Sequence, residues 1–440
     1  MKWHVILRVG SDDDFVSEVG DDTPRLAVAL EQCGNPGLVQ QHVVKDILER
    51  MGAGPSVPAE DLLTIAMAVY AVDIRVPRST ADDGWTREIV LHAPVFDPST
   101  WTVLSPLLRR ALDFLTGDSW TFEFRERHPR TPSEVPPKKK HVVKATDVEL
   151  FSGGLDSLAG AIDLLESGRT VVLAGHYGAG VTNSVQQNVL SALQAHYDRQ
   201  VVPCMFHVQP LKAADAEGEQ SMRSRSFLFL SLGVAVVSAL DQGRTLTVCE
   251  NGLISLNVPL TNPRIGSWST RTTHPHFIAL FRELLAGLGL AVVVALPARF
   301  ETKGELLSRV PNQGLLHTVA PLSMSCSHPE QGRFRKMSPG NHCGYCVPCI
   351  VRRASTAQAR VPDAVYDIDV LSPNAALTVG TGSDLRAFEI AIRRFRDARP
   401  SQALFDVLST GPLPKEHAAE YASVYRRGME EVARFLAATA

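Results

Sequence analysis

The sequence predicts an α/β fold built on a parallel sheet, and two observations support this class. From residue 148 onward, short apolar segments alternate with longer segments of helical periodicity. Apolar strands separated by amphipathic helices are typical of a parallel sheet that is covered on both faces. In addition, the segment 152–157, SGGLDS, joins the first of these strands to the helix that follows it.

The alternation defines the elements of this sheet domain in order. Strands are expected at residues 148–151, 170–174, 201–207, 245–249 and 291–294. The helices between and after them are expected at about residues 157–166, 182–196, 226–240 and 275–286.

The flanking regions carry patterns of their own. Residues 1–125 predict an N-terminal α+β domain, residues 126–146 a linker, and residues 357–440 a helical C-terminal extension. The linker is rich in proline and includes a run of three lysines. In the N-terminal region, strands are expected at 1–9, 85–93 and 120–124, and helices at 61–73 and 101–115. In the extension, helices are expected at 384–397, 402–408 and 416–436.

Composition excludes several classes of protein. The net charge is −3 and the sequence pI is near 6.5, so the chain lacks the basic excess of a nucleic-acid-binding protein. No apolar run reaches the length of a membrane span. Thiols clustered for metal binding, rather than paired as disulfides, predict a cytoplasmic protein.

The glycine-rich segment has the chemistry of a phosphate cradle. Gly153 and Gly154 allow backbone N–H groups to approach an anion with no Cβ in the way. Ser152 and Ser157 add hydroxyl groups, and the start of the helix adds its partial positive charge. The lysine of a Walker A loop is absent. Asp156, just before the helix, is by itself suited to capping that helix.

Four of the seven cysteines lie between residues 326 and 349. C-x-x-C-x-x-C with one further thiolate supplies the ligands of a tetrahedral structural zinc site, although an iron–sulfur cluster uses the same ligands. A closed site of this kind has no open position for chemistry and stabilises the fold. The expected metal ligands are Cys326, Cys343, Cys346 and Cys349.

These motifs resemble those of the 7-cyano-7-deazaguanine synthase family (the QueC type), which combines S-G-G-x-D-S with a C-terminal four-cysteine zinc site. The segments 223–231, 250–252 and 302–305 are similar to the family's R-N-x-x-F-L-S, ligand-turn and T-K-x-E segments. The resemblance covers about residues 147–356. Because the chain has long additions at both ends, its layout is most similar to the long QueC-like proteins of bacterial antiphage defence systems, the QatC type.

The resemblance implies a pyrophosphate-loop domain of the adenine nucleotide α-hydrolase, Rossmann-like type, which uses ATP and Mg²⁺ beside the structural Zn²⁺. ATP would activate a carboxylate, that of a 7-deazaguanine compound, with release of pyrophosphate, and a nitrogen nucleophile would then displace AMP. The residues it implies as catalytic are Asp156, Ser157, Arg225 and Lys303. Those implied to bind the nucleotide are Ser152, Gly153, Gly154, Leu155, Asp156, Ser157, His176, Glu250 and Asn251.

The sequence also allows other interpretations of some of these residues and of the function of the chain. Glu250 and Asn251 precede Gly252 in what is equally a simple strand-end turn, and His176 is equally a structural histidine. The chain could also be a nucleotide-binding scaffold of a defence complex without turnover, or a tRNA-modifying enzyme, although its charge disfavours direct binding of nucleic acid. Expected partners are ATP, a deazaguanine-like small molecule and proteins encoded nearby, with no membrane.

Overall fold

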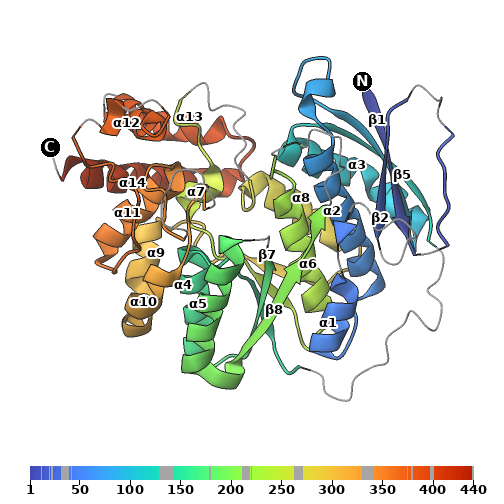
Figure 1. Ribbon diagram of the computed structural model, residues 1–440, viewed down its shortest axis with the longest axis horizontal. Helices are drawn as coiled ribbons and strands as arrows, with labels where there is room; N and C mark the ends of the chain where they lie inside the picture. The colour runs from blue at the N-terminus through green and yellow to red at the C-terminus, as the bar shows by residue number, and fades with distance from the viewer. Residues whose placement is uncertain are drawn as a thin grey trace.

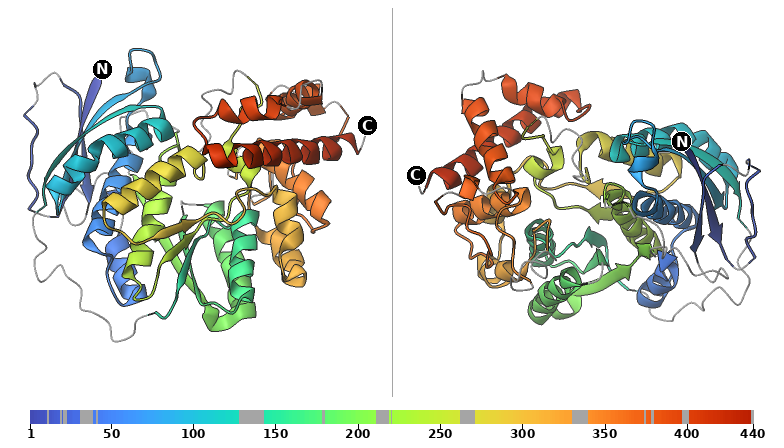
Figure 2. Two further views of the ribbon diagram at one scale, coloured as in Figure 1. Left: turned by 180° about the vertical axis from the view of Figure 1, so that it is seen from behind. Right: turned by 45° about the horizontal axis from the view of Figure 1, so that its top comes forward.

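The computed structural model describes residues 1–10, 12–18, 20, 23–30, 39–40, 42–127, 143–177, 180–210, 219, 221–261, 271–329, 340–373, 375–377, 380–396 and 401–438. Within them, an N-terminal sheet with its helices, a central sheet domain and a helical C-terminal region follow one another across the molecule (Figure 1). The two chain ends lie on opposite sides, as the further views also show (Figure 2).

The central sheet has five parallel strands in the order β11-β10-β6-β7-β8. The chain runs from β6 outward to β7 and β8, and then returns to the other side of β6 to form β10 and β11. This reversal creates a topological switch point between β6 and β10, where α/β sheets form a crevice at the carboxyl ends of their strands. The strand bounds are Asp147–Leu150 (β6), Val171–Tyr177 (β7), Val201–His207 (β8), Thr245–Thr247 (β10) and Val293–Ala295 (β11).

Helices cover both faces of this sheet, as the alternating sequence predicts. On β7, Val172 and Ala174 point into one hydrophobic core while Val171 and Leu173 point into another. Helices α1 and α6 pack on the first face, and α4 and α5 on the second. Their bounds are Val43–Met51 (α1), Leu155–Glu166 (α4), Val181–Tyr197 (α5) and Arg225–Ala239 (α6).

The N-terminal sheet corrects the expected α+β class of this region. Its four strands are parallel throughout, in the order β2-β1-β4-β5, so the region is α/β. The sequence predicted three of these strands, β1, β4 and β5, and the helix α3 between β4 and β5, but strand direction depends on how such crossovers fold back. The bounds are Lys2–Val9 (β1), Arg25–Leu30 (β2), Glu88–Val95 (β4), Ser119–Glu126 (β5), Val57–Arg75 (α2) and Pro98–Thr116 (α3).

The N-terminal region shares its hydrophobic core with the central domain. Every residue of α2 from Ala59 to Asp73 is buried, because the helix packs along α6. A short antiparallel ladder between Val39–Gln40 (β3) and Gln209–Pro210 (β9) adds a second connection. Most of the predicted linker, residues 128–142, lies outside the described residues.

The C-terminal region is helical, as expected, and packs around the long helix α14. Helices α11 and α13 both contact α14, and α11 also contacts α9. The helices from residue 252 onward, which include the last helices of the central domain, are Gly252–Leu256 (α7), Pro275–Gly287 (α8), Lys303–Arg309 (α9), Gln313–Val319 (α10), Val347–Ala359 (α11), Ser383–Arg396 (α12), Gln402–Leu408 (α13) and Ala418–Ala437 (α14). Among the described helices, none combines the length and the apolar character needed to span a bilayer.

Candidate functional site

The glycine-rich loop occupies the turn from β6 into α4. Gly153 has φ +78°, and a Cβ atom there would lie 2.9 Å from Cγ of Gln186, so glycine is required both by the backbone and by the space. Gly154 is the N-cap residue of α4 and makes no side-chain cap. The first N–H groups of this helix are therefore available to an anion.

The two serine hydroxyls of the loop converge on each other. The Oγ atoms of Ser152 and Ser157 are 3.2 Å apart, and the Ser157 hydroxyl donates to the Gly154 carbonyl over 3.1 Å. The N–H of Gly154 donates to the Ser152 hydroxyl over 3.2 Å. The loop thus presents backbone and hydroxyl groups from one compact turn, as predicted.

A cavity of about 300 Å³ opens beside this loop, at the switch point of the sheet. Most of the residues proposed from the sequence line it together, although they come from four separate segments of the chain. These lining residues are Ser152, Gly154, Leu155, Asp156, Ser157, Arg225, Glu250 and Lys303. Gly153 and Asn251 lie just behind the lining.

Asp156 is the centre of the polar contacts in the cavity. Its Oδ1 atom lies 3.3 Å from Nζ of Lys303, and its Oδ2 accepts a hydrogen bond of 2.8 Å from the Asn251 amide. Asn251 is fully buried and caps α7 by accepting from the N–H of Ile254. A carboxylate beside hydroxyl oxygens is the type of donor set that Mg²⁺ prefers, so the residues present fit such an ion.

Glu250 supplies a second carboxyl group to the cavity wall, and burial shifts the pKa of this group. Its Oε2 accepts from the hydroxyl of Thr273, which also lies 2.6 Å from the Ser255 hydroxyl. The residue keeps some solvent contact, but its carboxyl group is enclosed by protein, and this burial raises its pKa to about 7. Glu250 therefore can exchange a proton near neutral pH.

Arg225 begins α6 and reaches the cavity, whereas His176 does not. The His176 ring is buried and its Nε2 lies 2.8 Å from the Val208 carbonyl, so Nε2 carries the proton. Burial lowers its pKa to about 3, which keeps the ring neutral. Tyr70 of α2 packs edge-on against the ring. The proposed nucleotide contact of His176 is thus replaced by a structural role, and its carbonyl accepts from Arg225 over 3.4 Å.

Part of the cavity wall was not identified from the sequence. Met324 and Ser325 line the cavity, and the Met324 N–H donates to the Gly153 carbonyl over 3.0 Å. Thr272 and Ser226 form a hydroxyl pair at 2.8 Å on another side. The position of Met324 two residues before Cys326 was the available signal, because a metal ligand fixes the chain beside it.

The four predicted metal ligands come together in one cluster. The Sγ atoms of Cys326, Cys343, Cys346 and Cys349 all lie within 4.8 Å of one another, so they can hold a metal such as zinc. Sγ–Sγ distances of 4.0 Å (Cys326 to Cys346) and 3.8 Å (Cys343 to Cys349) are close to the edge of about 3.8 Å of a tetrahedron with metal–sulfur bonds of about 2.3 Å.

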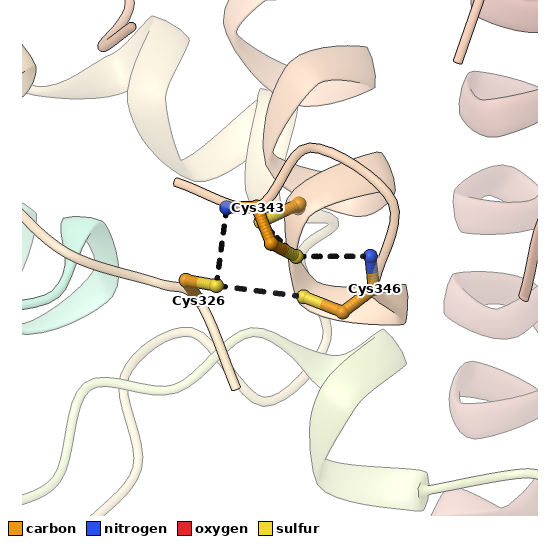
Figure 3. A group of neighbouring side chains, drawn as sticks. Cys326, Cys343 and Cys346 are labelled. Atoms are coloured by element: carbon orange, nitrogen blue, oxygen red, sulfur yellow. Dashed lines mark hydrogen bonds between the residues drawn. The ribbon is translucent and has the colours of Figure 1, made fainter. Parts of the chain in front are cut away.

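The chain around the cysteines is shaped for thiolates. Figure 3 shows Cys326, Cys343 and Cys346 directed toward one another, with backbone N–H groups facing their sulfur atoms. The N–H of Cys343 donates to Sγ of Cys326, and that of Cys346 to Sγ of Cys343, both over 3.4 Å. Gly344 has φ +83°, and any Cβ there would overlap the Ile368 carbonyl oxygen.

This cluster is joined to the cavity by α11. Pro348, between two ligand cysteines, lines the cavity. Farther along the helix, the buried guanidinium of Arg352 donates to the carbonyls of Ser323 and Ala320 over 2.9 and 2.8 Å. These contacts hold the segment that carries Met324, so the cysteine cluster and the cavity wall depend on one another.

No known family model matches the chain, and no curated protein is significantly similar to it.

Proposed function

We propose that the chain activates a carboxylate with ATP, releasing pyrophosphate and then AMP, as its resemblance to the 7-cyano-7-deazaguanine synthases implies. The observation that carries the proposal is the convergence of the glycine loop, Asp156, Arg225 and Lys303 on one cavity. Loop N–H groups and two cations are suited to phosphate, and the adjacent carboxylate is suited to the accompanying metal.

In the first step, a carboxylate oxygen of the acceptor attacks the α-phosphorus of ATP. The bond from this phosphorus to the bridging oxygen of the β-phosphate breaks, and pyrophosphate leaves with the electron pair. The loop and the N-terminus of α4 hold the β- and γ-phosphates, while Arg225 and Lys303 offset the charge that develops on the leaving group. Asp156 would hold Mg²⁺, which supplies charge neutralisation.

In the second step, a nitrogen nucleophile attacks the acyl carbon of the adenylate. The bond from this carbon to the AMP oxygen breaks, AMP departs, and the nitrogen loses a proton. Glu250 is the group in the cavity whose pKa, about 7, suits it to receive that proton.

The four cysteines would hold Zn²⁺ as a structural ion that stabilises the end of the central domain. All four positions of a tetrahedral ion are taken by sulfur, which leaves no site for substrate. The ion therefore contributes to function by fixing the cavity wall at Met324 and Pro348.

The direct test incubates the protein with ATP, Mg²⁺, ammonia and a 7-carboxy-7-deazaguanine, and measures AMP and pyrophosphate. We expect equal amounts of the two products, with a loss of at least about 100-fold in Ser152→Ala plus Asp156→Ala. Ser167→Ala, at the exposed far end of α4, is the matched control and should retain full activity. Product formation unchanged in the double variant would refute the assignment.

Two outcomes would favour the rival functions. Binding of ATP by calorimetry without AMP formation, in the presence of any candidate acceptor, would favour a nucleotide-binding scaffold of a defence complex. The packing of both flanking regions against cavity-bearing elements is compatible with that role. Salt-dependent binding of tRNA would favour a tRNA-modifying enzyme.

The acceptor is best identified by mass spectrometry of neighbouring gene products and of small-molecule pools, with and without the enzyme. A mass increment on a protein that depends on Asp156 would assign protein modification. A new small-molecule amide in the pools, or the nitrile that a second ATP-dependent activation of the amide oxygen would make from it, would assign small-molecule synthesis.

A further inference from the structure

The N-terminal region contacts the central domain beside one cation of the cavity. Asp73, at the end of α2, is fully buried. Its Oδ2 accepts from both the N–H and the hydroxyl of Ser224, each over 2.9 Å. Ser224 is the N-cap residue of α6 and directly precedes Arg225, which lines the cavity. The start of α6 is thus held by a residue that lies 151 positions earlier in the chain.

The C-terminal region makes an equivalent contact beside the other cation. Glu431 of α14 is buried, and its Oε2 accepts from the Thr302 hydroxyl over 2.7 Å and from the Gly304 N–H. A Cβ at Gly304 would lie 2.6 Å from Oε2 of Glu431, so α9 and α14 approach each other closely at this point. Lys303, which lies between these two residues, lines the cavity and pairs with Asp156.

We infer that Asp73 and Glu431 are positioning residues, through which the two flanking regions set the places of Arg225 and Lys303 in the phosphate-binding cavity. The inference rests on the proposed function in that it concerns the same cavity, and it assigns a role to the regions outside 147–356. Neither carboxylate lines the cavity, so each acts through the helix start that it holds.

Each carboxylate accepts hydrogen bonds from more than one donor. Asp73 accepts from Ser224 and from Nη2 of Arg87, which lies 2.9 Å from Oδ1. An amide at this position would set its NH₂ group against a fixed donor, either the Ser224 N–H or the Arg87 guanidinium, so Asp73→Asn disrupts the contact while keeping the volume of the side chain.

Glu431 accepts from Thr302, Gly304 and Ser355. An amide here could donate to the Ser355 hydroxyl, because that hydroxyl has the Val351 carbonyl as another acceptor. Glu431→Met is therefore the change to test, since it removes both oxygens and keeps most of the volume of the side chain.

The test measures pyrophosphate affinity by calorimetry on the full metal-loaded chain. We expect about tenfold weaker binding in Asp73→Asn, in the milder Ser224→Ala and in Glu431→Met. Ser238→Ala is the control on α6, because Ser238 also bonds the N-terminal region, through the Ser56 N–H, but at the far end of the helix. Glu430→Met is the control on α14, where Glu430 is only partly buried and pairs with Arg426. Both controls should bind as the unchanged protein does.

A double-mutant cycle distinguishes positioning from a general loss of stability. If Asp73 acts through Arg225, Ser224→Ala and Asp73→Asn should not weaken pyrophosphate binding further in Arg225→Ala protein. Likewise, Glu431→Met should not weaken it further in Lys303→Ala protein. Additive losses in these backgrounds, or absence of pyrophosphate binding by the unchanged protein, would overturn the inference. Pyrophosphate binding with a non-additive cycle but no AMP formation would instead refute only the proposed reaction.

Discussion

At the scale of single residues, the site depends on a few positions whose chemistry has no substitute. Gly153 combines a left-handed backbone with contact to Gln186, and Asp156 bridges Lys303 and Asn251. The carboxyl group of Glu250 is enclosed by protein, and this burial raises its pKa to about 7. Gly153 and Glu250 each make a separate prediction.

Gly153→Ala should weaken ATP binding more than it destabilises the fold. The left-handed conformation costs an L-residue about 1–2 kcal/mol, and the new Cβ would push against Gln186. Gly168→Ala is the matched control, because Gly168 has the same φ of +78° with no atom within 4 Å of the added Cβ. Urea unfolding should show a loss of stability in both variants, larger in Gly153→Ala because of the contact with Gln186, and ATP calorimetry should show lost binding for Gly153→Ala alone. Equal ATP affinity in both would contradict the phosphate-cradle interpretation.

Glu250 should make the protein less stable as pH rises from about 4.5 to about 7. Burial raises the pKa of its carboxyl group from 4.5 to about 7, so across this window the folded state binds more protons than the unfolded state. The stabilisation is complete below the unfolded pKa and is lost as pH rises through the folded pKa. The loss attributable to this group is at most about 3 kcal/mol.

The check is urea unfolding at pH 5 and pH 8 for the unchanged protein and for Glu250→Gln. The variant should lose less stability between the two pH values, because its amide does not ionise. Asp61 is a useful reference, since burial also raises its pKa to about 7. Asp61→Asn should reduce the pH dependence of the free energy of unfolding independently of Glu250→Gln. A pH dependence identical in Glu250→Gln and the unchanged protein would show that Glu250 is ionised in the fold.

At the scale of elements, the cysteine cluster fixes the start of α11, and through it the cavity wall. Cys346 is the N-cap residue of this helix, and Cys349 lies in its first turn. Arg352 on the same helix bonds the carbonyls that precede Met324. Loss of the metal should therefore release both the helix start and one side of the cavity.

Cys346→Ser protein is expected to be metal-poor, to unfold at a lower temperature and to bind ATP weakly. Structural zinc supplies on the order of 10 kcal/mol to small sites, so its loss exceeds the effect of one side chain. Cys204→Ser is the control for loss of a buried thiol, because Cys204 lies on β8 outside the cluster. Elemental analysis should find one zinc per chain in the control and in the unchanged protein. Retained stability and activity in Cys346→Ser, or brown iron-containing protein, would contradict the structural-zinc prediction.

At the scale of the whole molecule, the N-terminal sheet and the central domain should unfold together. Buried residues of both form one hydrophobic core, and α2 is enclosed between them over its length. An exposed apolar helix would be left if either unfolded alone, at a cost of about 25 cal/mol for each Å² of apolar surface.

Tryptophan fluorescence tests this directly, since Trp3, Trp85, Trp101 and Trp120 all belong to the N-terminal region and only Trp268 does not. The fluorescence transition should coincide with the loss of ATP binding during urea unfolding. A fluorescence transition at lower urea, with ATP binding intact, would show that the N-terminal region is an independent unit.

The sequence by itself determined the central α/β pattern, the position of the glycine loop and the metal-binding group. Strands β6, β7 and β8 lie close to the predicted positions, because an apolar run bounded by turns is a local signal. The cysteine cluster was equally local, since three of its ligands lie within seven residues of one another. Elements such as β2, α9 and α10 were missed, because a segment of six or seven residues carries few periods of a pattern, although α13, also of seven residues, was predicted at its observed bounds.

Only the tertiary structure decided which distant residues meet. It joined Arg225 and Lys303 to the loop, excluded His176 from the cavity, and made the N-terminal sheet parallel. It also connected Asp73 to Ser224 and Glu431 to Thr302. Each of these contacts depends on how strands pair and helices cross over long separations, and no local pattern of residues specifies that geometry.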